Sequence, residues 1–367
     1  MAVSIWDIDT PALLVDIDRL EHNLARMASR CHDAGVKLRP HTKTHKTPQI
    51  AWMQLQHGAT GVCVAKVGEA EVMFAAGVDD VFVVYPVLGD QKYERLLRLM
   101  ERADVRISLD SYEVAEAAST FFAGKKTKLK VLLEMDNGFG RCGLQSTNEA
   151  VELADKIADL PGVTLIGVMV FAGHSYRTTN TSQVIQIGRG EGSQAVSVAE
   201  ALRARGHNIE EVSIGSTPTT PYAARVEGIT EARPGVYAFM DQKQISLGSA
   251  TLDECALTVL ATVVSHPRPD RFIVDAGLKA LSGDTFGLDN YGLLLDLPEI
   301  KVNWASEEHG VIQLRPDQSI PNLRIGDKVR IVPDHACGTT NMHDTLVVTR
   351  DEQVVDEWRV AGRGKFR

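Results

Sequence analysis

The sequence predicts an α/β protein with an N-terminal (β/α)8 barrel of the TIM type and a C-terminal, mostly antiparallel β domain. Short apolar runs alternate with amphipathic helical patterns from residue 12 to residue 240, at intervals of roughly 25–35 residues, which is typical of parallel βαβ units. Eight such units fit a closed barrel better than an open doubly wound sheet. After residue 245 the pattern changes to β-rich runs that Pro, Gly and Asp turns separate.

Each predicted element follows from the spacing of its apolar residues. We therefore predict a barrel over residues 11–245 and a β-rich domain made of residues 1–10 and 246–367. Barrel strands are expected at Ala12–Asp16, Gly35–Leu38, Gly61–Val64, Val81–Val84, Val105–Leu109, Leu129–Glu134, Thr164–Met169 and Val212–Gly215. Helices are expected at Leu20–Ala34, Pro48–Gln56, Glu69–Ala76, Tyr93–Arg102, Tyr112–Phe122, Glu149–Ala158 and Ser193–Arg205. The β domain is expected to contain Leu257–Val264, Arg271–Val274, Lys328–Val332 and a hairpin of Thr345–Thr349 with Gln353–Trp358.

The composition excludes several classes of function. With 367 residues, 44% of them hydrophobic, the chain can bury a large core. A net charge of −9 without a basic block argues against nucleic acid as a partner. No apolar run is long enough to span a membrane, and the first residues lack the features of a signal peptide. The five cysteines are scattered and odd in number, which favours reduced thiols and a cytoplasmic protein.

A cluster of basic residues follows the predicted strand Gly35–Leu38. The segment RPHTKTHK, residues 39–46, lies at a strand end, where barrels carry their chemistry. Neighbouring cations and burial both lower the pKa of a lysine, so Lys43 is suited to condensing with a carbonyl group. Lys46 is the alternative, but it lies about one helical turn further on and is expected to point to a surface. A solvated basic loop is the other interpretation.

Seven motifs in order resemble one known family. They are DTPALLVD (9–16), RPHTKTHK (39–46), EMDNGFGRCG (134–143), GSTPT (215–219), RPGVY (233–237), EEHG (307–310) and PDHAC (333–337). Together they resemble the D-threonine aldolase and eukaryotic-type D-serine dehydratase family, the metal-activated branch of the alanine-racemase-like pyridoxal phosphate enzymes. The resemblance covers residues 9–345, and it implies a homodimer that acts on a small D-amino acid.

The resemblance implies that Lys43 forms the Schiff base with pyridoxal 5'-phosphate. The small-residue turn Gly215, Ser216 and Thr217 then becomes the candidate phosphate site, because barrels bind phosphate after strands 7 and 8. Gly235 would add an amide and Tyr237 a hydroxyl group to that site. Arg141, on a glycine-flanked loop, would bond the ring oxygen of the cofactor or a substrate carboxylate; a surface ion pair is its ordinary alternative.

His335 and Cys337 would form the metal site. They place an imidazole and a thiol two residues apart on an expected extended segment, and two ligands leave room for water and substrate. Zn²⁺ suits this pair, as do Mn²⁺ or Co²⁺ with added oxygen ligands. His174, after the predicted seventh strand, is expected to point into the barrel mouth and take a proton from the β-hydroxyl of the substrate. Tyr176 would bond cofactor or substrate or lie at the barrel rim, and His309 is either a metal-supporting residue or a solvated loop histidine.

These parts favour a D-threonine aldolase, which cleaves D-β-hydroxy-α-amino acids to glycine and an aldehyde. The alternative is a dehydratase of D-serine or D-threo-3-hydroxyaspartate, which releases a 2-keto acid and ammonia. His174 favours the aldolase, whereas Cys337 favours the dehydratase, because aldolases of this family typically carry aspartate at that position. A racemase would need a second base, and the non-catalytic cofactor carriers of the superfamily lack a C-terminal β domain. The segment from Asp275 to Lys279 also resembles the family, but we assign it no role.

Overall fold

The computed structural model describes residues 3–318 and 322–367, and the chain divides into two compact units. The barrel unit consists of Ala25–Lys43, Pro48–Gly235 and Gly364–Arg367. The β unit consists of the chain up to Leu24, Thr44–Thr47 and Val236–Arg363. The chain passes from one unit to the other five times, and one of these crossings is the peptide bond between Lys43 and Thr44.

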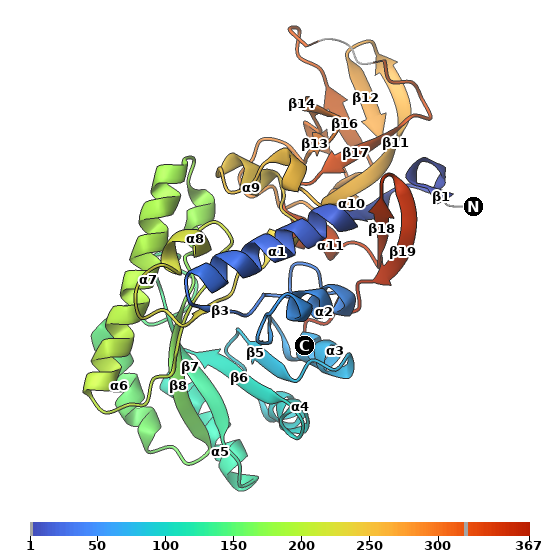
Figure 1. Ribbon diagram of the computed structural model, residues 1–367. Helices are drawn as coiled ribbons and strands as arrows, with labels where there is room; N and C mark the ends of the chain where they lie inside the picture. Colours follow the sequence, from blue (N-terminus) through green and yellow to red (C-terminus); the bar gives the residue numbers. More distant parts are fainter. Residues whose placement is uncertain (1–2, 319–321) are drawn as a thin grey trace. The chain divides into compact units, whose positions relative to one another are not determined.

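Within the described residues, eight parallel strands form the sheet of the barrel unit, in the order β3-β10-β9-β8-β7-β6-β5-β4. Figure 1 labels β3, β5, β6, β7 and β8 of this sheet. Cys63 donates its backbone N–H to Pro40 (2.7 Å), and Thr42 donates to the carbonyl of Cys63 (2.8 Å), so the segment after β3 joins β4 and completes the ring. The predicted (β/α)8 barrel is confirmed. The strands are β3 (Lys37–Leu38), β4 (Val62–Val64), β5 (Asp80–Val83), β6 (Asp104–Leu109), β7 (Leu129–Met135), β8 (Val163–Val170), β9 (Glu211–Ile214) and β10 (Glu231–Ala232).

One of the predicted barrel strands belongs to the other unit. Strand β2 (Ala12–Asp16) pairs antiparallel with β11 (Leu257–Arg268) and parallel with β18 (Thr345–Arg350), so its predicted place in the barrel is wrong. The eighth barrel strand is instead β10, whose two residues are too few to show a periodic pattern. As a result, His174 follows the sixth barrel strand, β8, and Ser216 follows the seventh, β9.

Seven of the helices that alternate with the barrel strands are those predicted, with one marked extension, and the short helix after β9 was not predicted. Helix α7 begins at Thr181 and not near Ser193, because its first half is rich in polar residues and glycine. Two of these glycines permit close packing: a Cβ at Gly188 would lie 3.0 Å from the Thr219 carbonyl oxygen, and one at Gly192 would lie 2.9 Å from that of Ala223. The helices are α1 (Ile17–Asp33), α2 (Pro48–Gln56), α3 (Val67–Ala75), α4 (Asp90–Met100), α5 (Tyr112–Gly124), α6 (Thr147–Ala158), α7 (Thr181–Ala204) and α8 (Thr220–Ala223).

The β unit is a mixed sheet of eleven strands within the described part of the chain, antiparallel except where β18 meets β2. The predicted C-terminal hairpin forms between β18 and β19 (Gln353–Arg359), and β1 (Val3–Ser4) pairs with β19, as expected for the first residues. The other strands are β12 (Arg271–Val274), β13 (Leu293–Leu294), β14 (Leu297–Lys301), β15 (Trp304–Ala305), β16 (Gly310–Gln313) and β17 (Lys328–Val332). Short helices α9 (Gln242–Ser246), α10 (Leu278–Leu281) and α11 (Ala336–Thr340) connect them.

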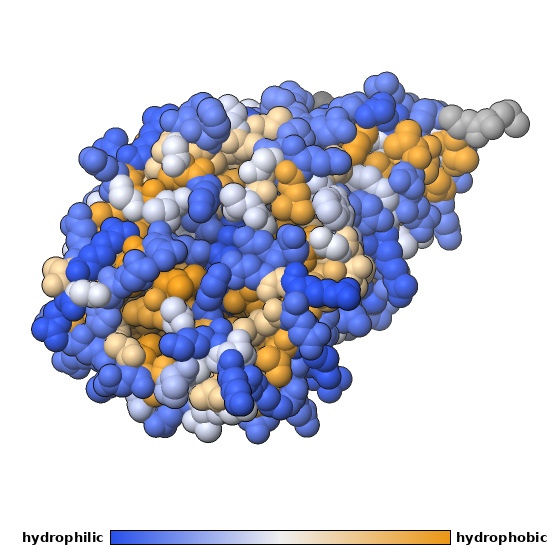
Figure 2. Space-filling model, turned by 60° about the horizontal axis from the view of Figure 1, so that its bottom comes forward, coloured by the Kyte–Doolittle hydropathy of each residue, from blue (hydrophilic) through white to orange (hydrophobic). Residues whose placement is uncertain are grey.

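Hydrophilic side chains cover most of the face drawn in Figure 2, and apolar side chains show between them, as expected of a chain in which 24% of the residues are charged. Over residues 3–318 and 322–367, the structure contains no helix that is both long and apolar enough to cross a membrane.

Candidate functional site

Lys43 extends across the C-terminal end of the barrel. It lies just beyond β3, and its Nζ is 5.6 Å from the centre of the Phe171 ring. Phe171 directly follows β8, and β3 and β8 are not neighbours in the sheet. The amine therefore lies over the mouth of the barrel, where the loops after the strands converge.

The basic neighbours of Lys43 differ from the sequence-based expectation. Arg39 is 3% exposed, and its guanidinium donates to Glu231 (2.6 Å) and to Asp80 (2.6 Å), so its charge is offset by two carboxylates. Repulsion by Arg39 is consequently weaker than the sequence suggests. Lys46, which we expected at a surface, is buried in the β unit, so that expectation is wrong.

Arg141 lies at the same aromatic ring as Lys43. Its Cζ is 5.1 Å from the centre of the Phe171 ring and 5.2 Å from that of Phe139, and the two rings meet edge to face at 5.7 Å. The guanidinium is about half exposed, donates to Glu134 at a long distance of 3.4 Å and also hydrogen-bonds Cys142. The Lys43 amine and the Arg141 guanidinium thus face one ring at the barrel mouth, and the guanidinium can bind an anionic oxygen.

The predicted phosphate turn follows β9. The Ser216 and Thr219 hydroxyl groups are 2.7 Å apart, and Thr220 donates its N–H to the Ser216 carbonyl, so the turn closes on itself. The Gly215 N–H donates to Glu191 (3.0 Å), so this amide is used in a hydrogen bond within the protein. Contrary to the expectation, it does not face an anion. A Cβ at Gly215 would lie 2.9 Å from the Arg233 Cβ, which explains why glycine is required there.

The two remaining residues of the predicted phosphate site belong to different units. Gly235 is the end of a barrel segment shortly after β10, whereas Tyr237 lies in the 3-10 turn η3 (Val236–Ala238) of the β unit, where it is buried. Both stay candidates from the sequence for the phosphate site.

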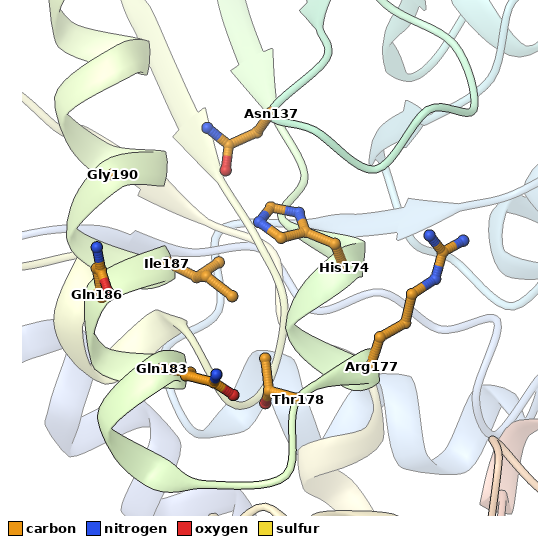
Figure 3. Close-up of a pocket in the computed structure, with 8 residues that line it drawn as sticks. All are labelled: Asn137, His174, Arg177, Thr178, Gln183, Gln186, Ile187 and Gly190. Atoms are coloured by element: carbon orange, nitrogen blue, oxygen red, sulfur yellow. The ribbon is translucent and has the colours of Figure 1, made fainter.

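His174 and Tyr176 lie on η2 (Gly173–Arg177), a 3-10 turn after β8. The His174 ring lines a cavity of about 600 Å³ and points toward Asn137 and α7 (Figure 3). That His174 points into the barrel mouth stays a prediction. Tyr176 is half-buried. The residues that line the cavity are Asn137, His174, Arg177, Thr178, Gln183, Gln186, Ile187 and Gly190.

The environment of His174 favours its neutral form. Its Nδ1 is buried, and no hydrogen-bond partner for it exists among the described residues. Burial lowers the pKa of His174; Asp136 opposes this effect and Arg177 adds to it. A neutral imidazole with an available nitrogen is the form that a general base requires.

His335 and Cys337 meet at the start of a short helix. The sequence suggests an extended segment, but only His335 is extended, as the N-cap of α11, and Cys337 lies in the first turn. The Cys337 Sγ is 3.1 Å from the Thr44 hydroxyl, and Thr44 is the residue that follows Lys43 in the chain. The His335 Nδ1 lies 2.8 Å from an Asp284 carboxylate oxygen, and the ring also hydrogen-bonds Cys337.

Negative groups surround the His335 ring. Burial disfavours the protonated ring, but Cys337, the hydrogen bond to Asp284 and the charge of Asp241 together raise the pKa of His335 to about 10. Asp241 also accepts the Ala336 N–H (3.0 Å) and so fixes the turn between the two candidate ligands. The described residues hold no group of three or more His, Cys, Asp or Glu side chains arranged for a metal. The candidate ligand set is therefore the predicted pair.

Asp241 and Asp284 were not predicted from the sequence, because they lie far from His335 in the chain. His309 is exposed in the turn between β15 and β16, as expected of a solvated loop histidine.

In the segment Asp275–Lys279, Asp275 accepts the Thr262 N–H (2.7 Å) and the Thr10 hydroxyl (2.5 Å). This segment thus anchors the N-terminal residues within the β unit.

Comparisons with known proteins identify the family. The family model for the alanine racemase N-terminal domain matches residues 15–243, and the family model for a putative serine dehydratase domain matches residues 256–349. The chain is 35% identical to a D-threonine aldolase from Arthrobacter sp., over 98% of this chain and 94% of that protein. It is also 35% identical to a D-threo-3-hydroxyaspartate dehydratase from Delftia sp., over 92% of this chain and 93% of that protein.

Solved structures agree. The crystal structure of D-threonine aldolase from Filomicrobium marinum matches with a TM-score of 0.91 and 32% identity, over 99% of this chain and 98% of that one. An alanine racemase from Bacillus anthracis matches with a TM-score of 0.67 at 16% identity, which shows the fold alone. The chain therefore belongs to the family of D-threonine aldolases and D-serine dehydratases, lyases built on the pyridoxal-phosphate-dependent alanine racemase fold.

Proposed function

We propose that this chain is a D-threonine aldolase that depends on pyridoxal 5'-phosphate and a divalent metal, and that cleaves D-β-hydroxy-α-amino acids to glycine and an aldehyde. The observation that carries the proposal is the position of the Lys43 amine over the barrel mouth, at the same ring as Arg141. A lysine at this place can condense with a carbonyl group, and an arginine beside it can bind an anionic oxygen.

The barrel residues fit the cofactor. Lys43 would hold its aldehyde carbon, Arg141 its ring oxygen, and the turn after β9 its phosphate, with Gly235, Tyr237 and Tyr176 as further candidates. Two observations support the fit of the cofactor. The Lys43 amine lies at the barrel mouth, and the turn after β9 lies so close to Arg233 that a Cβ at Gly215 would collide with that side chain. When bound, the cofactor supplies an electron sink that makes a bond at the substrate Cα cleavable.

His335 and Cys337 fit a divalent metal. Since Asp284 bonds the Nδ1 of His335, the Nε2 is oriented as a ligand, which is the usual arrangement of a metal-binding histidine. Imidazole and thiolate together suit Zn²⁺, and Mn²⁺ or Co²⁺ would also bind with oxygen ligands. When bound, the metal would lower the pKa of the β-hydroxyl of the substrate.

A dehydratase of D-serine or D-threo-3-hydroxyaspartate is the second candidate. Cys337 favours it, because the aldolases of this family typically carry aspartate there. In a dehydratase Lys43 would remove the Cα proton, and hydroxide would leave from Cβ. In the aldolase a base must remove the β-hydroxyl proton instead, and the neutral His174 with its available Nδ1 favours this route.

The test is to incubate the protein, loaded with pyridoxal phosphate and Mn²⁺ or Zn²⁺, with D-threonine, D-serine and D-threo-3-hydroxyaspartate. From hydroxyaspartate an aldolase gives glycine and glyoxylate, and a dehydratase gives oxaloacetate and ammonia. We expect glycine and acetaldehyde from D-threonine. Oxaloacetate or pyruvate as the main product would establish the dehydratase, and formation of an L-amino acid would indicate a racemase. Bound cofactor without turnover of any substrate would leave a cofactor carrier.

We also propose that the protein works as a homodimer in the cytoplasm. The family resemblance supports the dimer, and the five cysteines, none of which forms a disulfide, support a reducing compartment. The chain has a mass of 40.1 kDa, and light scattering after size-exclusion chromatography should give twice that mass. A mass of one chain would contradict the dimer.

A further inference from the structure

Helix α7 carries a buried carboxyl group that bonds two loops of the candidate site. Glu191 is fully buried, and its Oε1 accepts the backbone N–H of Ala172 (3.2 Å) and of Gly215 (3.0 Å). Its Oε2 accepts the hydroxyl of Thr219 (2.5 Å). Ala172 precedes His174 in the loop after β8, and Gly215 opens the turn after β9.

The next turn of α7 bonds a third loop. Gln194, on the same face of the helix, donates to the Asp136 carbonyl (2.9 Å) and accepts from the Asn137 side chain (2.6 Å). These residues begin the loop after β7 that carries Arg141. One face of α7 thus bonds the loops after three successive strands, and the glycines of the helix permit its close approach.

The hydrogen bonds of Glu191 determine the proton positions in the phosphate turn. Since the Thr219 hydroxyl donates its only proton to Glu191, the Ser216 hydroxyl must donate to Thr219, and the Thr219 N–H donates to Ser216. The Ser216 proton is therefore committed within the turn. The Ser216 hydroxyl has no second proton to donate to an anion at this place.

An apolar residue could fill the same space without the cost of burying a carboxyl group. A buried polar group whose hydrogen bonds are all satisfied instead favours a single arrangement of the segments to which it is bonded. We propose that Glu191 is a positioning residue, which holds the Gly215–Thr217 turn in the conformation that receives the cofactor phosphate. The inference rests on the proposed function, because it requires that pyridoxal phosphate binds here.

The test compares two aldehydes, pyridoxal phosphate and pyridoxal, which lacks the phosphate group. Dissociation constants come from the visible absorbance of the lysine-bound cofactor, for wild type, E191A and E191Q. We expect E191A to bind pyridoxal phosphate at least about tenfold more weakly, and pyridoxal less than about threefold more weakly. E191Q keeps one acceptor oxygen for the two amides but cannot accept from Thr219, and should lie between wild type and E191A.

Two further variants support the comparison. E200A removes an exposed glutamate from the same helix and should change neither constant. T219V removes only the hydroxyl bonded to Glu191, and should weaken pyridoxal phosphate selectively even where E191A does not fold. Equal losses for both aldehydes, or no loss, would overturn the positioning role. If wild type binds neither aldehyde, the proposed function itself fails and the inference fails with it.

Discussion

Lys43 is the residue on which the proposed chemistry depends most. We predict that K43A abolishes the visible absorbance of the lysine-bound cofactor and lowers lyase activity by at least about a thousandfold, because it removes the amine that lies over the Phe171 ring at the barrel mouth. K46A is the matched control, since Lys46 lies three residues on but belongs to the other unit. Absorbance that is lost in K46A and kept in K43A would reverse the assignment.

The pH profile of the aldolase should report on His174. Because burial lowers its pKa, the neutral base persists below the ordinary histidine value of about 6.5, and the acid limb of kcat/KM should lie below that value. Arg177 contributes to the lowering, so R177Q should move the limb to higher pH, while Asp136 acts in the opposite sense. The residues of α7 that face His174 across the cavity carry no charge.

R189Q, which removes an exposed arginine from α7, is the control for this profile and should leave the limb in place. The profiles are measured on all three proteins under the same saturating cofactor and metal. An acid limb that R177Q does not move would assign the base to another group.

At the scale of elements, α7 packs closely on one face and not on the other. A Cβ at Gly192 would lie 2.6 Å from a methyl group of Val226, whereas one at Gly190, half a turn away, would meet nothing within 4 Å. We predict that G192A lowers the free energy of unfolding by about 1–3 kcal/mol through overpacking. G190A should raise it by about 0.5–1 kcal/mol, because alanine favours the helix. Urea unfolding measures both, and equal effects at the two positions would contradict the packing.

The elements also show what a sequence pattern can and cannot reveal. The barrel was predictable because seven of its eight strands are apolar runs and helical patterns follow six of them. Strand β10 was not, since Glu231 and Ala232 form no period, and β2 has the same apolar pattern whether it joins a parallel or a mixed sheet. Single-chain periodicity reports burial, and the choice of partner strand depends on contacts far apart in the chain.

The same limit applies to the site. The residues that stand in motifs, such as Lys43, Arg141 and His335, were predictable from those motifs. The residues that hydrogen-bond to the site were not predictable. Asp284 lies in a loop 51 positions from His335, and Glu191 lies in a glycine-rich stretch of α7 whose sequence does not indicate a helix. Only the fold reveals that these carboxylates are bonded to site residues, because no local spacing connects them.

In the whole molecule, the two candidate sites belong to different units. The residues proposed for the cofactor lie mainly in the barrel unit, and His335 and Cys337 lie in the β unit. We therefore predict that EDTA, or the H335A substitution, abolishes lyase activity but leaves the absorbance of the lysine-bound cofactor within about twofold of the untreated protein. H309A removes an exposed histidine from the β unit and should change neither property.

In this proposal, the side chain at position 337 affects both which metal is preferred and which reaction is catalysed. C337D supplies an oxygen ligand in place of sulfur, so we expect preference to move from Zn²⁺ toward Mn²⁺, with activity kept within about tenfold. With D-threo-3-hydroxyaspartate as substrate, the ratio of glyoxylate to oxaloacetate should rise, because aspartate is the residue typical of the aldolases. C337A provides the comparison that lacks a ligand and should be inactive with either metal. If C337A retains full activity in the presence of EDTA, neither residue of the pair holds a catalytic metal.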